Sequence, residues 1–264
     1  MLEQLLYIVT GFVVGGLVGL TGVGGGSLMT PLLVLIFGQA PTTAVGTDLV
    51  FAATTKLAAT ASFGYSRRVD WRVVGRLALG SLPAAVGVLL ALWWSRRSPA
   101  GFDRIIVRCL GIMLLSTAIG LLLQSSVRRL GLKMTSLALR RTDRWTPLLT
   151  VIIGILLGAA VTLTSVGAGA LGVAALLYLY PLRLAADRLV ATDIAHALPL
   201  TLVAGLGHAS LGHVNLAVLG LLLIGSIPAV LIASRLAIRL PQSVLRAAIA
   251  VLLGVTGTRL LMAP

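Results

Sequence analysis

Thr21-Gly22-Val23-Gly24-Gly25-Gly26-Ser27 interrupts an apolar run that begins near Leu5 and resumes at Leu28. Because glycine has no Cβ, the backbone can leave the helix here and expose its N–H and C=O groups. In a lipid bilayer such a break is tolerated only where protein or a wet cavity supplies partners for those groups. A weaker copy occurs at Thr164-Ser165-Val166-Gly167-Ala168-Gly169-Ala170. Two glycine breaks at corresponding places in two halves are typical of the binding site of a secondary transporter.

The composition predicts a polytopic membrane protein. Of the 264 residues 58% are hydrophobic and only 11% are charged, whereas soluble domains have about 45–50% apolar and about 25% charged residues. We assign the net charge of +14 to loop Lys and Arg that set topology and meet anionic lipid, and we expect no nucleic-acid partner. The single Cys109 excludes an internal disulfide, no Cys/His set has zinc spacing, and no cofactor is expected.

Apolar stretches predict the helices. The first half has segments at Leu5–Leu20, Leu28–Phe37, Thr43–Phe63, Trp71–Trp94 and Ile105–Leu123, and the second half has them at Pro147–Leu163, Leu171–Tyr180, Leu189–Leu206, Leu216–Ala233 and Val244–Met262. The segment after each glycine break is about half as long as the roughly 20 residues that span a bilayer. We therefore divide the chain into a first repeat (1–123), a basic cytoplasmic linker (124–146) and a second repeat (147–264).

Matching motifs support this duplication. Gly11, Gly15, Thr21, Val23, Gly24 and Gly26 recur at a constant shift of 143 residues, as Gly154, Gly158, Thr164, Val166, Gly167 and Gly169. Thr47-Asp48 recurs as Thr192-Asp193, and Gly80-Ser81-Leu82-Pro83 recurs as Gly225-Ser226-Ile227-Pro228, both at a shift of 145. A Thr-Asp pair and a Gly-Ser-x-Pro motif that hold one shift indicate duplication more strongly than coincidences of Gly and Leu do.

Loop charge predicts the topology. If each pair of segments around a glycine break forms a re-entrant hairpin, loops 64–71, 124–146, 180–188 and 234–243 share one side and hold most of the loop Lys and Arg. The excess makes that side cytoplasmic. Each half then has one broken, re-entrant helical hairpin and three transmembrane helices, and because three is odd the two repeats have inverted topology. The expected fold is an all-α, multi-pass protein of the inner cell membrane.

The breaks are candidate binding residues for a small anion. A half-length helix that starts at a break presents unpaired N–H groups and the positive end of its dipole, and such helix starts bind anions. Glycines that serve only helix packing are the alternative. The candidate substrate-binding residues are Thr21, Gly24, Gly25, Gly26, Ser27, Thr164, Ser165, Gly167, Gly169 and Lys56.

Charged residues inside the segments are candidates for coupling or gating. Carboxylates within a bilayer are costly and usually functional, so Asp48 and Asp193 are singled out, with helix capping as the alternative. Lys56 lies on the face of Asp48 and could pair with it or attract an anion, unless it snorkels to the interface. His196 follows Asp193 by three residues and could relay a proton, or could be a polar residue packed in the bundle. His208 and His213 flank a short loop and are expected to be solvated.

The motif pattern resembles the TauE/SafE family of sulfite exporters over essentially the whole chain. The resemblance rests on Gly15 to Ser27, Pro31, Ala44-Val45-Gly46-Thr47-Asp48, Ser165 to Gly169, Ala191-Thr192-Asp193 and the stretch from His196 to Gly205-x-Gly207-His208. It implies a transporter with two inverted repeats that carries a small sulfur-containing anion such as sulfite or sulfoacetate. Ala168 and Ala170 stand where the first half has Gly25 and Ser27, so the two sites need not be equivalent.

Three functions compete at this stage. The first is export of a small sulfur-containing anion by alternating access, with the anion bound between the two breaks. The second is an anion channel, or a transporter of another small anion, on the same fold. The third, a membrane-embedded enzyme, lacks a nucleophile–base set beyond Asp193 and His196. The expected partners are a small anionic substrate and the lipid bilayer, and the sequence leaves open whether the chain forms a homo-oligomer.

Overall fold

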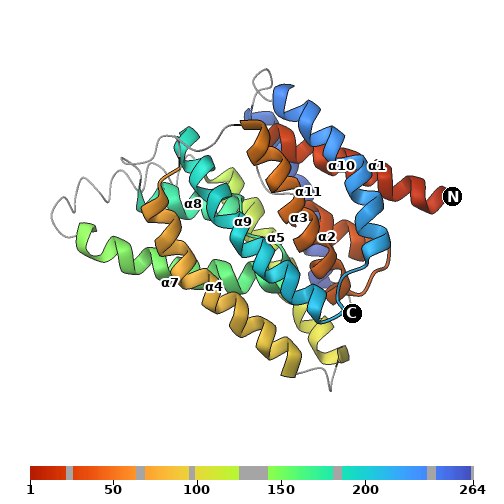
Figure 1. Cartoon of the computed structure of the whole chain (residues 1–264), viewed down its shortest axis with the longest axis horizontal. Helices are drawn as coiled ribbons and strands as arrows, with labels where there is room; N and C mark the ends of the chain where they lie inside the picture. The colour runs from red at the N-terminus through yellow and green to blue at the C-terminus, as the bar shows by residue number, and fades with distance from the viewer. Residues whose placement is uncertain are drawn as a thin grey trace.

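The described part of the chain is helical throughout. The computed structural model describes residues 1–21, 26–63, 69–94, 99–124, 142–180, 186–236 and 242–262, and these residues contain no strand. The helices are α1 (Leu2–Thr21), α2 (Gly26–Leu35), α3 (Pro41–Phe63), α4 (Trp71–Trp94), α5 (Pro99–Leu122), α7 (Thr142–Thr164), α8 (Ala170–Leu179), α9 (Ala186–Ser210), α10 (Leu216–Leu236) and α11 (Gln242–Met262) (Figure 1). The expected all-α fold is confirmed.

Most helix ends lie within a few residues of the predicted ones. The largest differences are at the starts of α5 and α7, which begin at Pro99 and Thr142 rather than at Ile105 and Pro147. Helix α5 begins with Pro99, which is favoured in the first position of a helix, and α7 begins with polar residues, so hydropathy marks neither start. The last residues of the expected linker are therefore helical, and residues 125–141 of it lie outside the described part of the chain.

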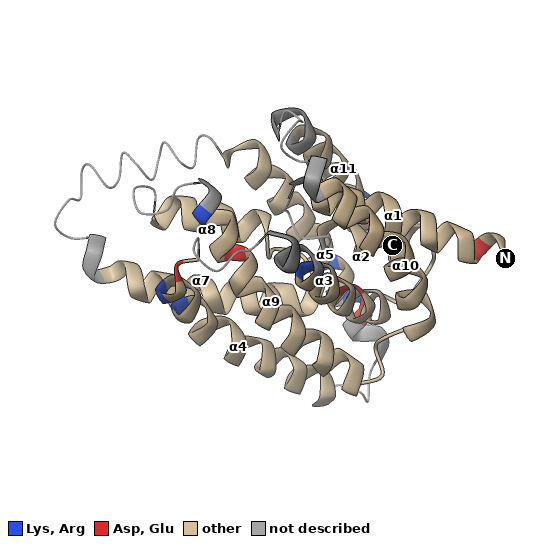
Figure 2. Cartoon of the chain, turned by 45° about the horizontal axis from the view of Figure 1, so that its top comes forward, with Lys and Arg blue, Asp and Glu red and all other residues tan. Residues whose placement is uncertain are grey.

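Six described helices are long and apolar enough to cross a membrane. They lie at Leu2–Leu20, Trp71–Trp94, Asp103–Leu122, Trp145–Thr164, Arg188–Ser210 and Leu216–Ala233. Large apolar side chains are exposed along them, for example Phe12 on α1, Leu79 on α4 and Ile155 on α7. Figure 2 shows few charged positions along the described helices. An apolar outer face of this kind fits a lipid environment, so the chain is a multi-pass membrane protein.

Two helices are only half as long as a span. Helices α2 and α8 have 10 residues each, which gives a length of about 15 Å at 1.5 Å per residue. Each follows a helix of full span length, α1 or α7, across a break. The two arms at each break are thus unequal, one long and one short. Whether each pair returns to its own side of the membrane stays a prediction.

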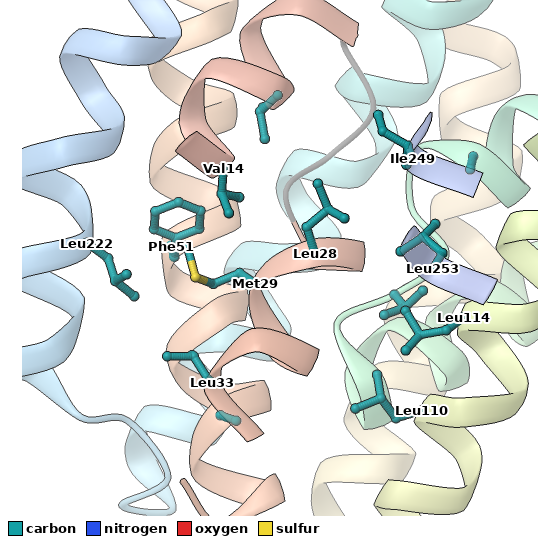
Figure 3. Packing of buried hydrophobic residues seen from close by; sticks show 14 of the residues in the cluster. Val14, Leu28, Met29, Leu33, Phe51, Leu110, Leu114, Leu222, Ile249 and Leu253 are labelled. Carbon is teal, nitrogen blue, oxygen red and sulfur yellow. The ribbon is translucent and has the colours of Figure 1, made fainter. Parts of the chain in front are cut away.

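Helix α2 is packed on both sides by the core. Met29 and Leu33 are fully buried, and Figure 3 shows Met29 beside Phe51 of α3 while Leu28 points in another direction. Farther along the same cluster, Leu110 and Leu114 of α5 meet residues of α11. Because its side chains are enclosed in this way, the short helix is held by packing rather than by its own helix propensity.

The longest helix contacts join the two halves of the chain. Helix α1 packs along α10, α7 packs along α4, α3 packs against α9, and α5 packs against α11 (Figure 1). Glycines allow the closest approach. A Cβ on Gly11 would overlap with the backbone of Leu222, and one on Gly154 would overlap with that of Leu77. Small residues at such crossings let helix backbones touch, which replaces the hydrophobic driving force that lipid does not supply.

These contacts are repeat-equivalent. Gly11 of the first half lies against Leu222 of the second half. The corresponding residues, Gly154 at a shift of 143 and Leu77 at a shift of 145, lie against each other in the same way. The same holds for a pair of capping contacts. The N–H of Asn215 donates to the Thr47 hydroxyl at 3.0 Å, and the N–H of Asp70 donates to the Thr192 hydroxyl at 3.1 Å. The packing thus repeats as the sequence does. The opposite orientation of the two repeats in the membrane stays a prediction.

We predict that Gly225→Leu destabilises the protein. Any Cβ at Gly225 would overlap with the carbonyl of Ile8, so α1 and α10 would have to separate, at a cost of about 1–3 kcal/mol or more. The measurement is the thermal midpoint of the detergent-solubilised protein, followed by tryptophan fluorescence. Gly220→Leu on the same helix is the control, because nothing lies within 4 Å of its Cβ position. Equal midpoints for the two variants would contradict the packing.

Candidate functional site

The second glycine break is held in a backbone conformation that few residues tolerate. Ser165 has φ 59, and Gly167 and Gly169 both have φ 119. Gly169 is the N-cap of α8, and only glycine adopts such a φ without strain. The two glycines predicted from the motif are therefore needed for the shape of the turn. Ser165 is strained in the left-handed region, a feature that clusters at functional sites.

Thr164 serves the backbone of the break. Its hydroxyl donates to the carbonyl of Ala160 at 2.7 Å, and the N–H of Val166 donates to the same hydroxyl at 3.2 Å. These bonds give partners to backbone groups near the point where α7 ends, which is what a bilayer environment requires. Thr164 was predicted to donate to a substrate, and its hydroxyl is already engaged.

The first break lies mostly outside the described residues. Thr21 ends α1 and Gly26 begins α2, but the surroundings of these two residues and the whole of residues 22–25 are not described. The predicted roles of Thr21, Gly24, Gly25 and Gly26 therefore stay predictions. Ser27, at the start of α2, is buried.

Asp48 is enclosed at the beginning of α2. Its side chain is 0% exposed. Its Oδ2 accepts the backbone N–H of Thr30 at 3.1 Å, and the Thr30 hydroxyl donates to the same oxygen. The Ser165 side chain lies beside this carboxyl and interacts with it. A carboxylate from α3 thus joins the first turns of α2 to the second glycine break, which lies far away in the sequence.

Asp193 occupies the equivalent place at the beginning of α8. It is 2% exposed, and the backbone N–H of Gly169 donates to its carboxyl. A Cβ on Gly172 would overlap with Oδ1 of Asp193, so the carboxyl lies directly against the α8 backbone. Capping of their own helices is wrong for both acids, because α3 begins at Pro41 and α9 begins at Ala186, about two turns before them. Each carboxylate meets the start of a half-length helix, where an acid is favoured, and each is also fully inside the protein.

Lys56 interacts with both carboxylates. It is on α3, two turns beyond Asp48, and is 5% exposed. Its electrostatic partners are Asp193 of α9 and Asp48 of its own helix. Snorkelling to the interface is therefore wrong for this lysine. A buried ammonium persists only with partners of opposite charge, and here these partners come from both repeats.

Three oxygen atoms at this cluster make no hydrogen bond in the described structure. They are Oδ1 of Asp48, Oδ1 of Asp193 and Oγ of Ser165. Buried polar atoms normally have partners, and each exception calls for an explanation. Here two of the three exceptions belong to the acids that interact with Lys56, and the third belongs to the serine beside Asp48.

His196 contacts a serine rather than a carboxylate. Its Nε2 lies 2.8 Å from the hydroxyl of Ser81 on α4, and the ring is almost completely buried. The repeat-equivalent pair is Phe51 and Ser226, and Oγ of Ser226 is buried without a partner. Histidine and phenylalanine therefore make the two halves of the site different in polarity.

One sequence expectation about histidine is wrong. His208 was expected to be solvated, but it is 0% exposed and its Nε2 lies 3.0 Å from the carbonyl of Thr162 on α7. The reason is that α9 continues to Ser210, so His208 belongs to the buried helix and not to the loop. His213 is partly buried, with its ring centroid 5.5 Å from that of His208.

Thr30 and Gly172 were missed by sequence reasoning. Thr30 follows the break by only a few residues, so a search for hydroxyls just beyond the glycines could have included it. Gly172 lies in an apolar run and its repeat mate is Met29, so neither its spacing nor its partner in the other half marks it. Only the contact with Asp193 shows why a glycine is there.

Comparison with known proteins agrees with this architecture. Residues 7–260 match the family model described as Sulfite exporter TauE/SafE. The chain is 39% identical over 264 residues to a Bacillus subtilis (strain 168) protein named "Probable membrane transporter protein YjnA", and the match covers 96% of this chain and 98% of that protein. No solved structure matches the chain significantly.

We predict that Gly172→Ala lowers stability. In a helix interior this change normally stabilises by about 1 kcal/mol, but here the new Cβ would strike the Asp193 carboxyl. The thermal midpoint in detergent is expected to fall. Gly254→Ala, at a helical position with nothing within 4 Å, is the control and is expected to raise the midpoint slightly.

The same measurement in an Asp193→Ala background isolates the contact. With the carboxyl removed, Gly172→Ala should cost nothing further, because the coupling between two contacting residues disappears when one partner is gone. A Gly172→Ala protein as stable as Gly254→Ala, or an equal loss in both backgrounds, would contradict the proposed contact.

Proposed function

Because the chain belongs to the TauE/SafE family of sulfite exporters and is a membrane transporter of that type, we propose that it exports a small sulfur-containing anion. The substrate class is sulfite or an organosulfonate such as sulfoacetate, the route is alternating access, and the location is the inner cell membrane. The family and the name of the relative indicate a transporter rather than an enzyme.

One observation carries the proposal: a buried lysine interacts with two carboxylates, and both carboxylates contact the second glycine break. Lys56 is on α3, interacts with Asp193 on α9, and is close to the carboxyl that Ser165 contacts. An ammonium in a low-dielectric site attracts an anion far more strongly than one in water. Ser165 adds a buried hydroxyl that has no aligned hydrogen bond. Together they offer a charge and a donor to a small oxyanion.

The carboxylates limit where that anion can bind. The Thr30 donors are used by Asp48, and the N–H of Gly169 is used by Asp193. The proposed anion therefore contacts Lys56 and Ser165 first. The start of α2, with Ser27 and the glycines Gly24 to Gly26, and Gly167 in the second break complete the proposed site. This changes the sequence-based proposal, in which every donor at the two breaks faced the substrate.

Alternating access is proposed from the repeat-equivalent packing. The same contacts join α1 to α10 and α7 to α4, so a motion that loosens one set can tighten the other at little difference in energy. The site lies where α3 and α9 meet, between these two pairs. An inside-negative potential itself favours anion export, by about 2.3 kcal/mol per charge for 100 mV.

We predict saturable sulfite flux that depends on Lys56. In proteoliposomes loaded with sulfite, wild-type protein is expected to give saturable efflux and Lys56→Met only the background rate, because the anion loses its counter-charge. Lys133→Met, which changes a lysine of the linker, should leave the flux unchanged. If Lys56→Met does not give monodisperse protein, Lys56→Met with Asp193→Asn restores charge balance and is tested instead.

We predict a weaker effect at Ser165. Ser165→Ala should raise the KM for sulfite about ten- to a hundredfold, since a hydrogen bond to a charged group contributes about 1.5–3 kcal/mol. Ser116→Ala is the control, because the hydroxyl of Ser116 on α5 donates to the carbonyl of Ile112 in its own helix. Sulfate, thiosulfate and sulfoacetate in the same assay define the substrate. Absence of saturable flux for all four anions would refute the transporter, and linear, non-saturating flux would identify a channel.

A further inference from the structure

The two repeat-equivalent carboxylates are held differently. Asp48 accepts two hydrogen bonds at one oxygen, from the backbone and the side chain of Thr30. Thr30 is 0% exposed, so both donors are fixed by the core. Asp193 instead accepts the N–H of Gly169, and the residue equivalent to Thr30 is Val173, which has no side-chain donor. Asp48 is therefore the more strongly fixed acid.

The surroundings of the two acids differ in the same direction. Beside Asp48, the repeat positions hold Met29 and Phe51, both fully buried and apolar. Beside Asp193, the same positions hold Gly172 and His196. The ring of His196 reaches Ser81 of α4 through a 2.8 Å contact. The Asp193 side of the site therefore has a titratable side chain one helical turn away, whereas the Asp48 side has a phenylalanine at the equivalent position.

We propose that Asp193 is the residue that takes up a proton when an anion binds beside Lys56, while Asp48 remains an ionised, structural acceptor. This inference rests on the proposed function and names its coupling step. The proton moves from solvent to the Asp193 carboxylate on binding and returns to solvent on release. Lys56, which then no longer faces a charged Asp193, pairs with the anion.

Charge balance requires such a step. With all three groups ionised, Asp48, Asp193 and Lys56 sum to one net negative charge, and a monovalent anion would make it two. Like charges enclosed together in a low dielectric are strongly unfavourable. A proton on one carboxylate restores the original charge when the anion enters. The hydrogen bonds of Thr30 stabilise the ionised form of Asp48, which leaves Asp193 as the acceptor of the proton.

Few other charged groups face Asp193. On α3 these groups are Lys56, which interacts with Asp193 directly, and Asp48, which interacts with Lys56. On α9 itself, His196 lies one turn away and bonds to Ser81. Helix α8 contributes a backbone N–H and has no charged side chain. Helix α7 has its charged residues, Asp143 and Arg144, at the end opposite to the break. Just before α4, the N–H of Asp70 donates to the hydroxyl of Thr192, and Arg76 of α4 donates to the hydroxyl of Tyr180 at 3.4 Å. Lys56 is the charged side chain that interacts with the Asp193 carboxyl in the described structure.

The test counts protons against anions. Proteoliposomes with an internal pH-sensitive dye are loaded with sulfite, and initial proton and sulfite fluxes are compared at one pH for wild type, Asp193→Asn and Asp48→Asn. Sulfite itself takes up a proton near neutral pH, but this contribution is the same for all variants. Wild type is expected to move about one more proton per sulfite than Asp193→Asn. Asp48→Asn should keep the wild-type ratio.

A second readout is the pH dependence of binding. At pH values where Asp193 is ionised in the free protein, the affinity of wild type for sulfite should fall as the pH rises. The fall per pH unit should be about tenfold larger than for Asp193→Asn. If Asp48→Asn does not give folded protein, Thr30→Val removes a donor to Asp48 and is expected to keep the wild-type proton ratio.

Equal proton-to-sulfite ratios in wild type and Asp193→Asn would overturn the inference, as would loss of the extra proton in Asp48→Asn or Thr30→Val. In either case saturable sulfite flux would remain, so the proposed function would stand. If wild type gives no saturable sulfite flux while another anion of the panel does, the same comparison is made with that anion. If no anion of the panel gives saturable flux, the proposed function and the inference about Asp193 both fail. If the flux is saturable but the proton ratios are equal, only the inference about Asp193 fails.

Discussion

The burial of one ammonium and two carboxylates between α3 and α9 constrains the rest of the structure. Lys56, Asp48 and Asp193 are almost completely excluded from the surface, and removal of one partner from a buried ion pair costs about 3–5 kcal/mol. Helices α3 and α9 must therefore remain in contact, although they belong to different halves of the chain. The half-length helices α2 and α8 begin where the carboxylates lie, because the starts of helices supply the N–H groups that buried acids require.

Much of this arrangement could be predicted from the sequence. Hydropathy places the helices, because the lipid-facing sides must be apolar, and the glycine motifs place the breaks, because φ values such as 119 at Gly167 need glycine. The pairing of Asp48 with Asp193 as repeat mates also follows from a constant shift. The partners within the site do not follow. Gly172 and Thr30 act through contacts between helices, and no local pattern encodes which helix faces them.

His208 is a residue for which the local sequence pattern predicts the wrong environment. A histidine next to a glycine-containing loop is usually solvated, but four more residues of α9 place it in the core against α7. Thr164 is a similar case. A hydroxyl beside a break can bind a ligand or can form hydrogen bonds with the backbone of the break. The sequence does not distinguish these two roles. The hydrogen bonds to Ala160 and Val166 decide for the backbone.

The departures from the repeat are more informative than the repeat itself. Duplication alone would give two equivalent acids, and a symmetric site has no reason to bind a proton on one side rather than the other. Thr30 is replaced by Val173, Met29 by Gly172 and Phe51 by His196, and each change removes a constraint from Asp193 or adds a polar neighbour. The packed crossings of α1 with α10 and of α7 with α4 keep their equivalent glycines. The helix crossings are thus symmetric, as the proposed exchange between two similar states requires, while the charged centre is asymmetric.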